Sequence, residues 1–281
     1  MAVQIPLPES ARAPEQVDAA HVREVRTDVA YLRAAMVNVA FVGPPDPGDR
    51  GWVLIDTGVT GTKKEIIAGA ASRFGASSRP AAIIQTHGHF DHIGALEDLS
   101  EAWDAPIYAH PLEHPFLTGR QSYPAPDTGA DGGIMPKLAP LFPRSPIDVS
   151  RRLQTLPEDG SVPFLPGWRW LHTPGHTPGH VSFWREGDRT LIAGDAIITT
   201  GQESAYEIAV QEPEMHGPPR YFTPDWTAAA ASVRRLAALD PDLLVTGHGR
   251  AMAGPVMLET LHRLAEHFEE IALPKSLRPG A

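Results

Sequence analysis

The segment 86–92 reads Thr-His-Gly-His-Phe-Asp-His and places four side chains that can bind a metal within six positions. Neutral imidazole and carboxylate groups are ligands that zinc, iron and manganese share. On an extended loop His87 and His89 point one way, whereas Asp91 and His92 turn with the chain toward a neighbouring position. The spacing therefore predicts one loop that can supply two metal ions, with a polar surface loop as the alternative interpretation.

Three further segments end in a histidine or an aspartate after an apolar strand or a sharp turn. Residues 172–180 read His-Thr-Pro-Gly-His-Thr-Pro-Gly-His, and His176 lies between the two turns, where it can reach a metal. The first and last histidines of that segment are predicted to pack or to support a ligand. Asp195 and His248 each follow a buried strand and a glycine, so both are candidate ligands, with turn capping as the alternative for Asp195.

The elements predicted around these residues alternate between strands and helices. A helix is expected after Thr62, which forms a capping-box pattern with Glu65, and it should end at Gly75. A buried strand over 81–85 then delivers the chain to the histidine-rich loop. The other expected elements are a helix over 93–103, a strand over 168–172, a hairpin over 181–193, a helix that starts at Thr223-Pro224, a strand over 243–246 and a helix over 256–271.

This order predicts an α/β fold of two similar halves packed sheet against sheet, with the helices outside. We expect residues 1–20 to form an N-terminal arm and residues 21–281 a single domain. Two irregular stretches, 111–166 and 199–223, are interpreted as insertions that line the substrate pocket, the first with a short helix over 134–141.

Aromatic side chains dominate over cations in and beside these insertions, which favours an apolar or neutral acyl substrate. Packing of the insertions themselves is the alternative role. The candidate substrate contacts are Phe116, Tyr123, Tyr206, His216, Tyr221, Phe222 and Trp226.

The composition narrows the classes of protein. The chain has 281 residues and no cysteine, which excludes disulfides and thiolate ligands. Its net charge of −10 argues against a surface-wide basic footprint and leaves a local basic patch open. We therefore expect a small-molecule substrate and neither a nucleic-acid nor a membrane partner; monomer and homo-oligomer both stay open. The first residues lack the features of a secretory signal and no apolar run approaches ~20 residues, which predicts a cytoplasmic protein.

Taken together and in order, the motifs resemble those of the metallo-β-lactamase superfamily. The matching segments are LIDTG at 54–58, THGHFDH at 86–92, TPGHTPGH at 173–180, AGD at 193–195 and GHG at 247–249. This resemblance implies a four-layer αβ/βα sandwich with the metal site at one edge.

The resemblance also implies the roles of individual residues. His87, His89 and His176 would hold one divalent cation, Asp91, His92 and His248 a second, and Asp195 would bridge them. Asp56 and Thr86 would brace the metal loop from behind. The cations would be Zn²⁺, with Fe²⁺ or Mn²⁺ as alternatives, and a bridging hydroxide would attack the carbonyl of a thioester, ester or lactone. Asp91 and Asp195 are thus the implied catalytic residues, Asp91 by orienting the hydroxide or carrying a proton.

Several branches of the superfamily fit the sequence less well. A β-lactamase with a cysteine ligand is excluded, the other β-lactamase subclass with this motif lacks the bridging Asp195, and the flavin-partnered di-iron branch has glutamate in place of His89. Phosphodiesterases that act on nucleic acid carry basic elements that this chain lacks. Glyoxalase II has a long helical C-terminal domain where one helix is expected here, and lactonases have tyrosine where this chain has Ile198. The main alternative is a persulfide dioxygenase that holds one iron.

Overall fold

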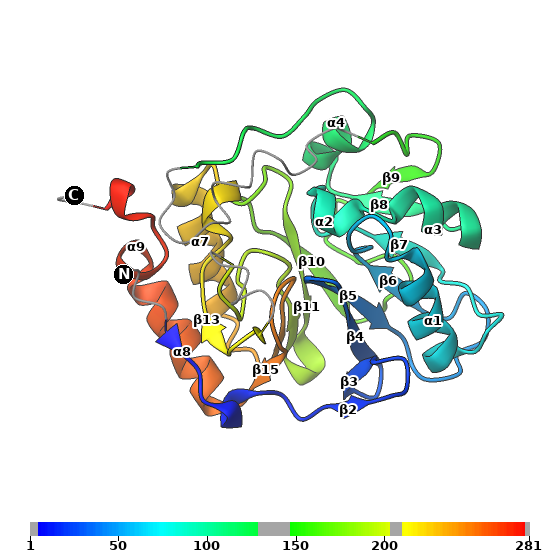
Figure 1. Ribbon diagram of the computed structural model, residues 1–281, viewed down its shortest axis with the longest axis horizontal. Coiled ribbons are helices and arrows are strands. Elements are labelled where there is room, and N and C mark those ends of the chain that lie inside the picture. The colour runs from blue at the N-terminus through cyan, green and yellow to red at the C-terminus, as the bar shows by residue number, and fades with distance from the viewer. Residues whose placement is uncertain (1–4, 129–146, 203–209, 279–281) are drawn as a thin grey trace. The chain divides into compact units, whose positions relative to one another are not determined.

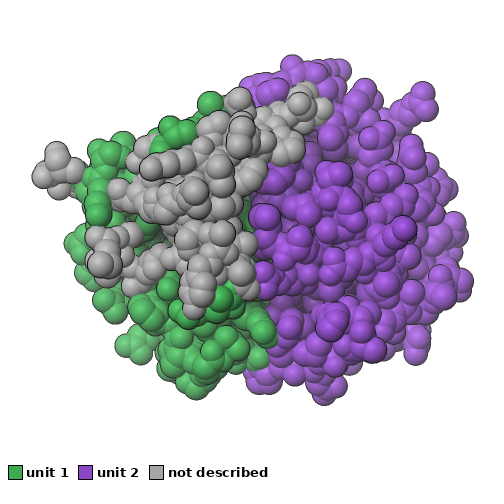
Figure 2. Space-filling model, in the orientation of Figure 1, with its two compact units in different colours: residues 1–13, 124–143, 171–281 green, residues 14–123, 144–170 purple. Residues whose placement is uncertain are grey.

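The computed structural model describes residues 5–128, 147–202 and 210–278. The chain divides into two compact units, coloured separately in Figure 2. Unit 1 contains residues 1–13, 124–143 and 171–281, and unit 2 contains residues 14–123 and 144–170. Over the described part of the chain, no helix has the length and apolar character that crossing a membrane requires.

Unit 2 is built on an eight-stranded sheet whose strands follow one another in chain order, β2 to β9. The first pairings are antiparallel, and those from β6 to β9 are parallel. The strands are β2 (Gln16–Val17), β3 (Arg23–Arg26), β4 (Val29–Ala34), β5 (Val37–Val42), β6 (Val53–Ile55), β7 (Ala82–Ile84), β8 (Ile107–Ala109) and β9 (Leu153–Thr155). The helices are α1 (Lys63–Phe74), α2 (Phe90–Ile93), α3 (Leu96–Trp103) and α4 (His114–Leu117), and a 3₁₀ turn spans Pro111–Glu113.

Helices α1 and α3 cover one face of this sheet (Figure 1), and periodicity explains the packing. Alternate residues of β4 enter the core, as expected for a strand, whereas α1 buries residues four apart, Ile66, Ala70 and Phe74. The predicted helix after Thr62 is therefore confirmed. The capping box is wrong, because the Thr62 hydroxyl donates to the carbonyl oxygen of Val59 (2.7 Å) and makes no cap.

The predicted continuous helix over 93–103 is interrupted at Gly94. The Gly94 N–H donates to the carbonyl oxygen of Gly58 (2.7 Å), and a Cβ at Gly94 would lie only 2.1 Å from the Thr60 nitrogen. The chain is thus tied to the turn that follows β6, so α2 ends at Ile93 and a second helix begins at Leu96.

Unit 1 contains a five-stranded sheet in the order β10-β11-β12-β14-β15 and a two-stranded sheet of β1 and β13. The boundary between the units falls within β10. The strands are β1 (Ile5–Pro6), β10 (Trp168–His172), β11 (Val181–Arg185), β12 (Thr190–Ile192), β13 (Glu214–Met215), β14 (Leu243–Val245) and β15 (Met252–Ala253). The helices are α7 (Trp226–Ala237), α8 (Pro255–Glu266) and α9 (Phe268–Ile271), with 3₁₀ turns at Glu9–Ala11, Glu186–Asp188, Arg220–Phe222 and Lys275–Leu277.

The predicted hairpin of β11 and β12 is confirmed, with the turn at Glu186–Asp188. Strand β12 then pairs in parallel with β14, and Ile192 lies opposite Val245. Helices α7 and α8 pack against the inner strands of this unit (Figure 1), and their core also takes in Ile5 and Leu7 from the predicted N-terminal arm. The predicted helix over 134–141 lies outside the described residues.

Helix α7 begins two residues later than the sequence predicts. Asp225 is the N-cap, and its carboxylate accepts from the N–H of Ala228 (2.9 Å). The hydroxyl of Thr223, the predicted cap, instead donates to the carbonyl oxygen of Pro219 (2.7 Å). The Thr223 hydroxyl does not cap α7 and instead contacts His176.

Candidate metal centre

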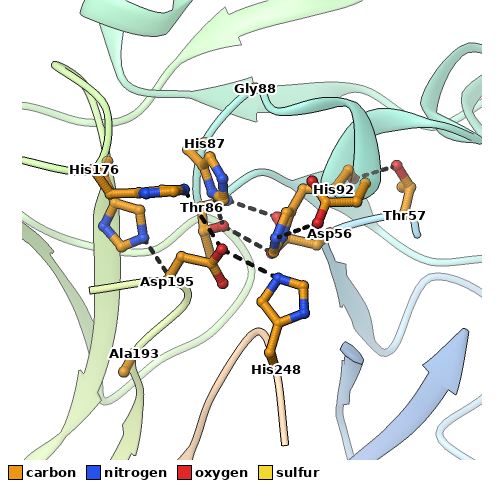
Figure 3. Close-up of polar contacts among 12 residues, drawn as sticks. Asp56, Thr57, Thr86, His87, Gly88, His92, His176, Ala193, Asp195 and His248 are labelled. Carbon is orange, nitrogen blue, oxygen red and sulfur yellow. Dashed lines mark hydrogen bonds and ion pairs between the residues drawn. The ribbon is translucent and has the colours of Figure 1, made fainter. Parts of the chain in front are cut away.

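Asp56 holds the histidine-rich loop of unit 2 by three hydrogen bonds (Figure 3). Its Oδ1 accepts from the Thr86 N–H (2.8 Å), and its Oδ2 accepts from the Thr86 hydroxyl (2.7 Å) and from Nδ1 of His92 (2.8 Å). The parallel register of β6 and β7, which pairs Ile55 with Ile84, brings the two segments together. Asp56 is buried and takes a left-handed conformation (φ 61°), which aspartate tolerates better than most residues.

These bonds fix which ring nitrogen of His87 and His92 can bind a metal. The carboxylate of Asp56 can only accept, so Nδ1 of His92 carries the proton. The Thr86 hydroxyl donates to Asp56 and must therefore accept from Nδ1 of His87, 3.0 Å away. In both rings the lone pair is left on Nε2, the arrangement that a carboxylate or hydroxyl partner imposes on metal-binding histidines.

The metal-capable side chains of this loop lie close together. The rings of His87 and His92 are 4.2 Å apart and those of His87 and His89 are 4.8 Å apart, between centroids. One ligand atom of His87 lies within 4.8 Å of a ligand atom of His89. The Asp91 carboxylate, partly exposed, is 4.0 Å from Nε2 of His92. Buried imidazoles beside a carboxylate form a donor set that suits a divalent cation.

Unit 1 supplies a second group of metal-capable side chains, centred on Asp195 (Figure 3). Its Oδ2 lies 3.2 Å from Nε2 of His248 and 3.5 Å from Nε2 of His176, and all three residues are buried. The Thr223 hydroxyl, which donates to Pro219, accepts from Nδ1 of His176 (3.2 Å). Nε2 of His176 then faces the carboxylate with its lone pair, an arrangement that a cation between the two atoms would stabilise.

Asp195 is itself held by a buried chain of hydrogen bonds. Nε2 of His180 accepts from the Asp195 N–H (2.9 Å), so Nδ1 of His180 donates to the Thr173 hydroxyl (2.9 Å). The Thr173 hydroxyl contacts that of Ser182 (3.0 Å), which donates to the carbonyl oxygen of Ala193 (2.9 Å). His180 therefore supports Asp195 from behind.

The predicted substrate contacts lie in different surroundings. The Tyr123 ring stacks on Phe116 (3.8 Å between centroids), and its hydroxyl bonds to Glu113; burial and the Glu113 carboxylate raise the pKa of Tyr123 well above its ordinary value. In unit 1, His216 pairs with Glu214, Tyr221 contacts Phe222, and Trp226 packs against Phe268. Tyr206 lies outside the described residues, and substrate contact by the others stays a prediction.

Sequence reasoning missed Glu113, Thr57 and the contact of Thr223 with His176. Thr57 donates from both its N–H and its hydroxyl to the His92 carbonyl oxygen, each at 2.7 Å. The LIDTG segment carried a signal for Thr57, since it precedes the loop in the motif order. A glutamate in an irregular segment carried none.

Comparison with known proteins identifies the family. Residues 32–248 match the family described as the metallo-beta-lactamase superfamily. The chain belongs to this superfamily. Membership confirms the predicted α/β class and the metallo-β-lactamase fold, and solved structures similar to the chain share that fold.

Two relatives and two structures describe its place in the superfamily. The chain is 47% identical over 249 residues to "Probable metallo-hydrolase YflN" of Bacillus subtilis (strain 168), covering 88% of this chain and 94% of that protein. It is 31% identical over 197 residues to "Probable metallo-hydrolase YybB" of the same organism, covering 70% and 74%. The structure of TTHA1623 in a di-iron-bound form is 31% identical, with a TM-score of 0.50 and coverage of 79% and 91%. A beta-lactamase domain protein from Burkholderia ambifaria gives a TM-score of 0.63 at 20% identity, with coverage of 93% and 81%, and shows the fold alone.

Proposed function

We propose that the chain is a metal-dependent hydrolase that binds two divalent cations and cleaves a thioester, ester or lactone at its carbonyl group. One observation carries the proposal: the Nδ1 atoms of His92, His87 and His176 each lie against an oxygen that accepts their proton. This pattern recurs in both units and leaves Nε2 as the ligand atom in each ring. A carboxylate or hydroxyl that accepts from Nδ1 and leaves Nε2 for a cation is typical of metal-binding histidines.

The proposed ligands follow the superfamily motif. His87, His89 and His176 would hold one cation, Asp91, His92 and His248 would hold the other, and Asp195 would serve both. The names of the similar Bacillus proteins support a metallo-hydrolase, and the di-iron form of TTHA1623 makes iron a candidate beside zinc and manganese.

Bound divalent cations supply a hydroxide at neutral pH and positive charge for a developing oxyanion. The residues of this chain have complementary tasks. Asp195, fixed by His180, presents its carboxylate toward the histidines of unit 1. Asp91 is the partly exposed carboxylate of the set, which suits it to orient a nucleophile or to carry a proton to the leaving group.

The test combines metal analysis with a substrate panel. Protein purified without added metal should contain about two metal ions per chain, and it should hydrolyse at least one of a thioester, an ester and a lactone. A β-lactam and a phosphodiester complete the panel. Asp195→Asn should abolish both bound metal and activity, whereas the matched control Asp188→Asn, on the β11–β12 turn, should change neither.

A different result would point to the alternative chemistry. One iron per chain, with oxygen uptake on glutathione persulfide and no hydrolysis across the panel, would establish the persulfide dioxygenase instead. Asp195→Asn protein with full metal content and full hydrolysis would refute the ligand assignment.

A further inference from the structure

A buried acid and a phenol contact the histidine-rich loop at Gly88, the residue between two proposed ligands. The Gly88 N–H donates to Oε2 of Glu113 (2.9 Å) and to the hydroxyl of Tyr123 (3.0 Å). The Tyr123 hydroxyl in turn donates to the same Oε2. The three groups therefore form a closed triangle of hydrogen bonds around one backbone amide.

Glycine is needed at position 88 because a larger side chain would collide with its neighbours, and not because of the backbone conformation. Its φ lies outside the left-handed region, so alanine could adopt the same backbone. However, a Cβ at Gly88 would lie 2.6 Å from the Tyr123 hydroxyl, whereas the next neighbours, Oε2 of Glu113 and Cδ2 of Leu117, are at 3.4 Å. A single oxygen atom thus accounts for most of the space that alanine would need.

Tyr123 also contacts the side chain of His89, one of the proposed metal ligands. The rings of Tyr123 and His89 meet edge to face (4.5 Å between centroids), and the Tyr123 ring stacks on that of Phe116 at an interplanar angle of 12°. Glu113 is fully buried at the junction of its 3₁₀ turn with α4. Glu113 by burial and Tyr123 by stacking are therefore packed against the rest of the unit while they contact the loop.

We propose that Glu113 and Tyr123 are positioning residues that fix the loop carrying His87 and His89 for metal binding. The inference rests on the proposed metal centre. A loop clamped before the metal arrives loses less conformational freedom on binding, and outer partners of this kind typically contribute 10–100-fold to metal affinity. The carboxylate adds a negative charge beside the loop, which also favours a cation.

The experiment measures zinc affinity by competition with a chromogenic chelator, resolving the two binding steps, in four variants. Tyr123→Phe and Glu113→Gln should each weaken one step about tenfold, and Gly88→Ala should weaken it further. The double variant Gly88→Ala/Tyr123→Phe should bind more tightly than Gly88→Ala alone, because the oxygen that collides with the new methyl group is gone. Tyr108→Phe, on β8, is the matched control and should bind as the wild type does.

Two readouts separate this inference from general damage and from failure of the proposed function. Urea unfolding of the metal-free protein should show Tyr123→Phe and Glu113→Gln still folded, and only one of the two binding steps should change. If the wild type binds metal and these two variants bind it equally tightly, the inference is wrong while the proposed function stands. If the wild type binds no metal, both are wrong. If the double variant does not bind metal more tightly than Gly88→Ala, the inference that Tyr123 and Glu113 fix the loop is also wrong.

Discussion

Asp56→Asn should weaken metal binding because it moves a proton between the two ring nitrogens of His92, while the shape of the side chain at position 56 hardly changes. Asparagine has nearly the size of aspartate and also tolerates the left-handed backbone that Asp56 adopts (φ 61°). If its oxygen keeps the bond to the Thr86 N–H, its NH₂ group faces Nδ1 of His92, which must then accept. The proton of His92 moves to Nε2, the nitrogen that the proposed metal needs.

The magnitude follows from the hydrogen bonds that the structure assigns to Asp56. Three donors reach its carboxylate, and hydrogen bonds to charged groups contribute about 1.5–3 kcal/mol each against about 1 kcal/mol for neutral ones. Loss of the charge weakens each bond by about 0.5–2 kcal/mol and should therefore cost the metal-free protein about 1.5–6 kcal/mol of unfolding free energy. The wrong tautomer of His92 should weaken metal binding by about 10–100-fold.

Urea denaturation of the metal-free protein and chelator competition measure the two effects separately. Asp49→Asn is the matched control: Asp49 is exposed and pairs with Arg79, so this variant should bind metal as the wild type does. An Asp56→Asn protein that keeps wild-type metal affinity would refute the assignment of the His92 proton. A loss of stability below about 0.5 kcal/mol, the range of ordinary surface substitutions, would refute the hydrogen-bond estimate.

Three other predictions concern separate parts of the chain. The hydrogen bond from Arg79 lowers the pKa of Asp49 to about 2. Asp49 therefore contributes stability that is fully present above its unfolded-state pKa of about 4 and is lost as the pH falls through about 2. A carboxyl NMR titration should find the Asp49 pKa at about 2, and Arg79→Met should raise that pKa toward about 4. Gly175→Ala should lower the free energy of unfolding by about 2–5 kcal/mol, because φ is +133° and the new Cβ would lie 2.4 Å from a backbone nitrogen of α7. The control Gly187→Ala adds its Cβ in open space and should have little effect. Equal urea midpoints for the two variants would contradict this packing. Thr173→Val removes the hydroxyl partner of the histidine that supports the proposed bridging aspartate, and chelator competition should show metal affinity reduced about tenfold.

The sequence predicts the helices and strands whose local apolar pattern matches the face that is buried in the folded protein. Short runs rich in apolar residues coincide with β4 and β5, which are buried at almost every position, and the spacing of Ile66, Ala70 and Phe74 coincides with α1. Candidate ligands are equally visible, because Asp195 and His248 each follow an apolar strand and a glycine. Histidine and aspartate at strand ends have few structural reasons to recur together.

What the sequence does not predict depends on contacts between distant residues. Thr223 and Asp225 are both good N-caps, and the choice between them depends on a carbonyl oxygen four residues before Thr223 and on His176. The break at Gly94 arises from the turn after β6, which no helix propensity records. Glu113 carries no local signal, since only folding brings its carboxylate to the Gly88 amide.

The parallel pairing of β12 and β14 has a consequence for how this protein can change. Ile192 lies opposite Val245, and the ladder continues through the bond from the Gly247 N–H to the Gly194 carbonyl oxygen (2.8 Å). Asp195 and His248 therefore stand at the same offset from paired residues, and the fixed distance between neighbouring strands sets their separation. The length of the connection that joins the two strands does not enter this separation, although Thr199 and Thr223 within it contact His248 and His176. One residue inserted within either strand would shift its aspartate or histidine by a full step and turn it to the opposite face. A change of length within either of these two short strands would therefore separate Asp195 from His248.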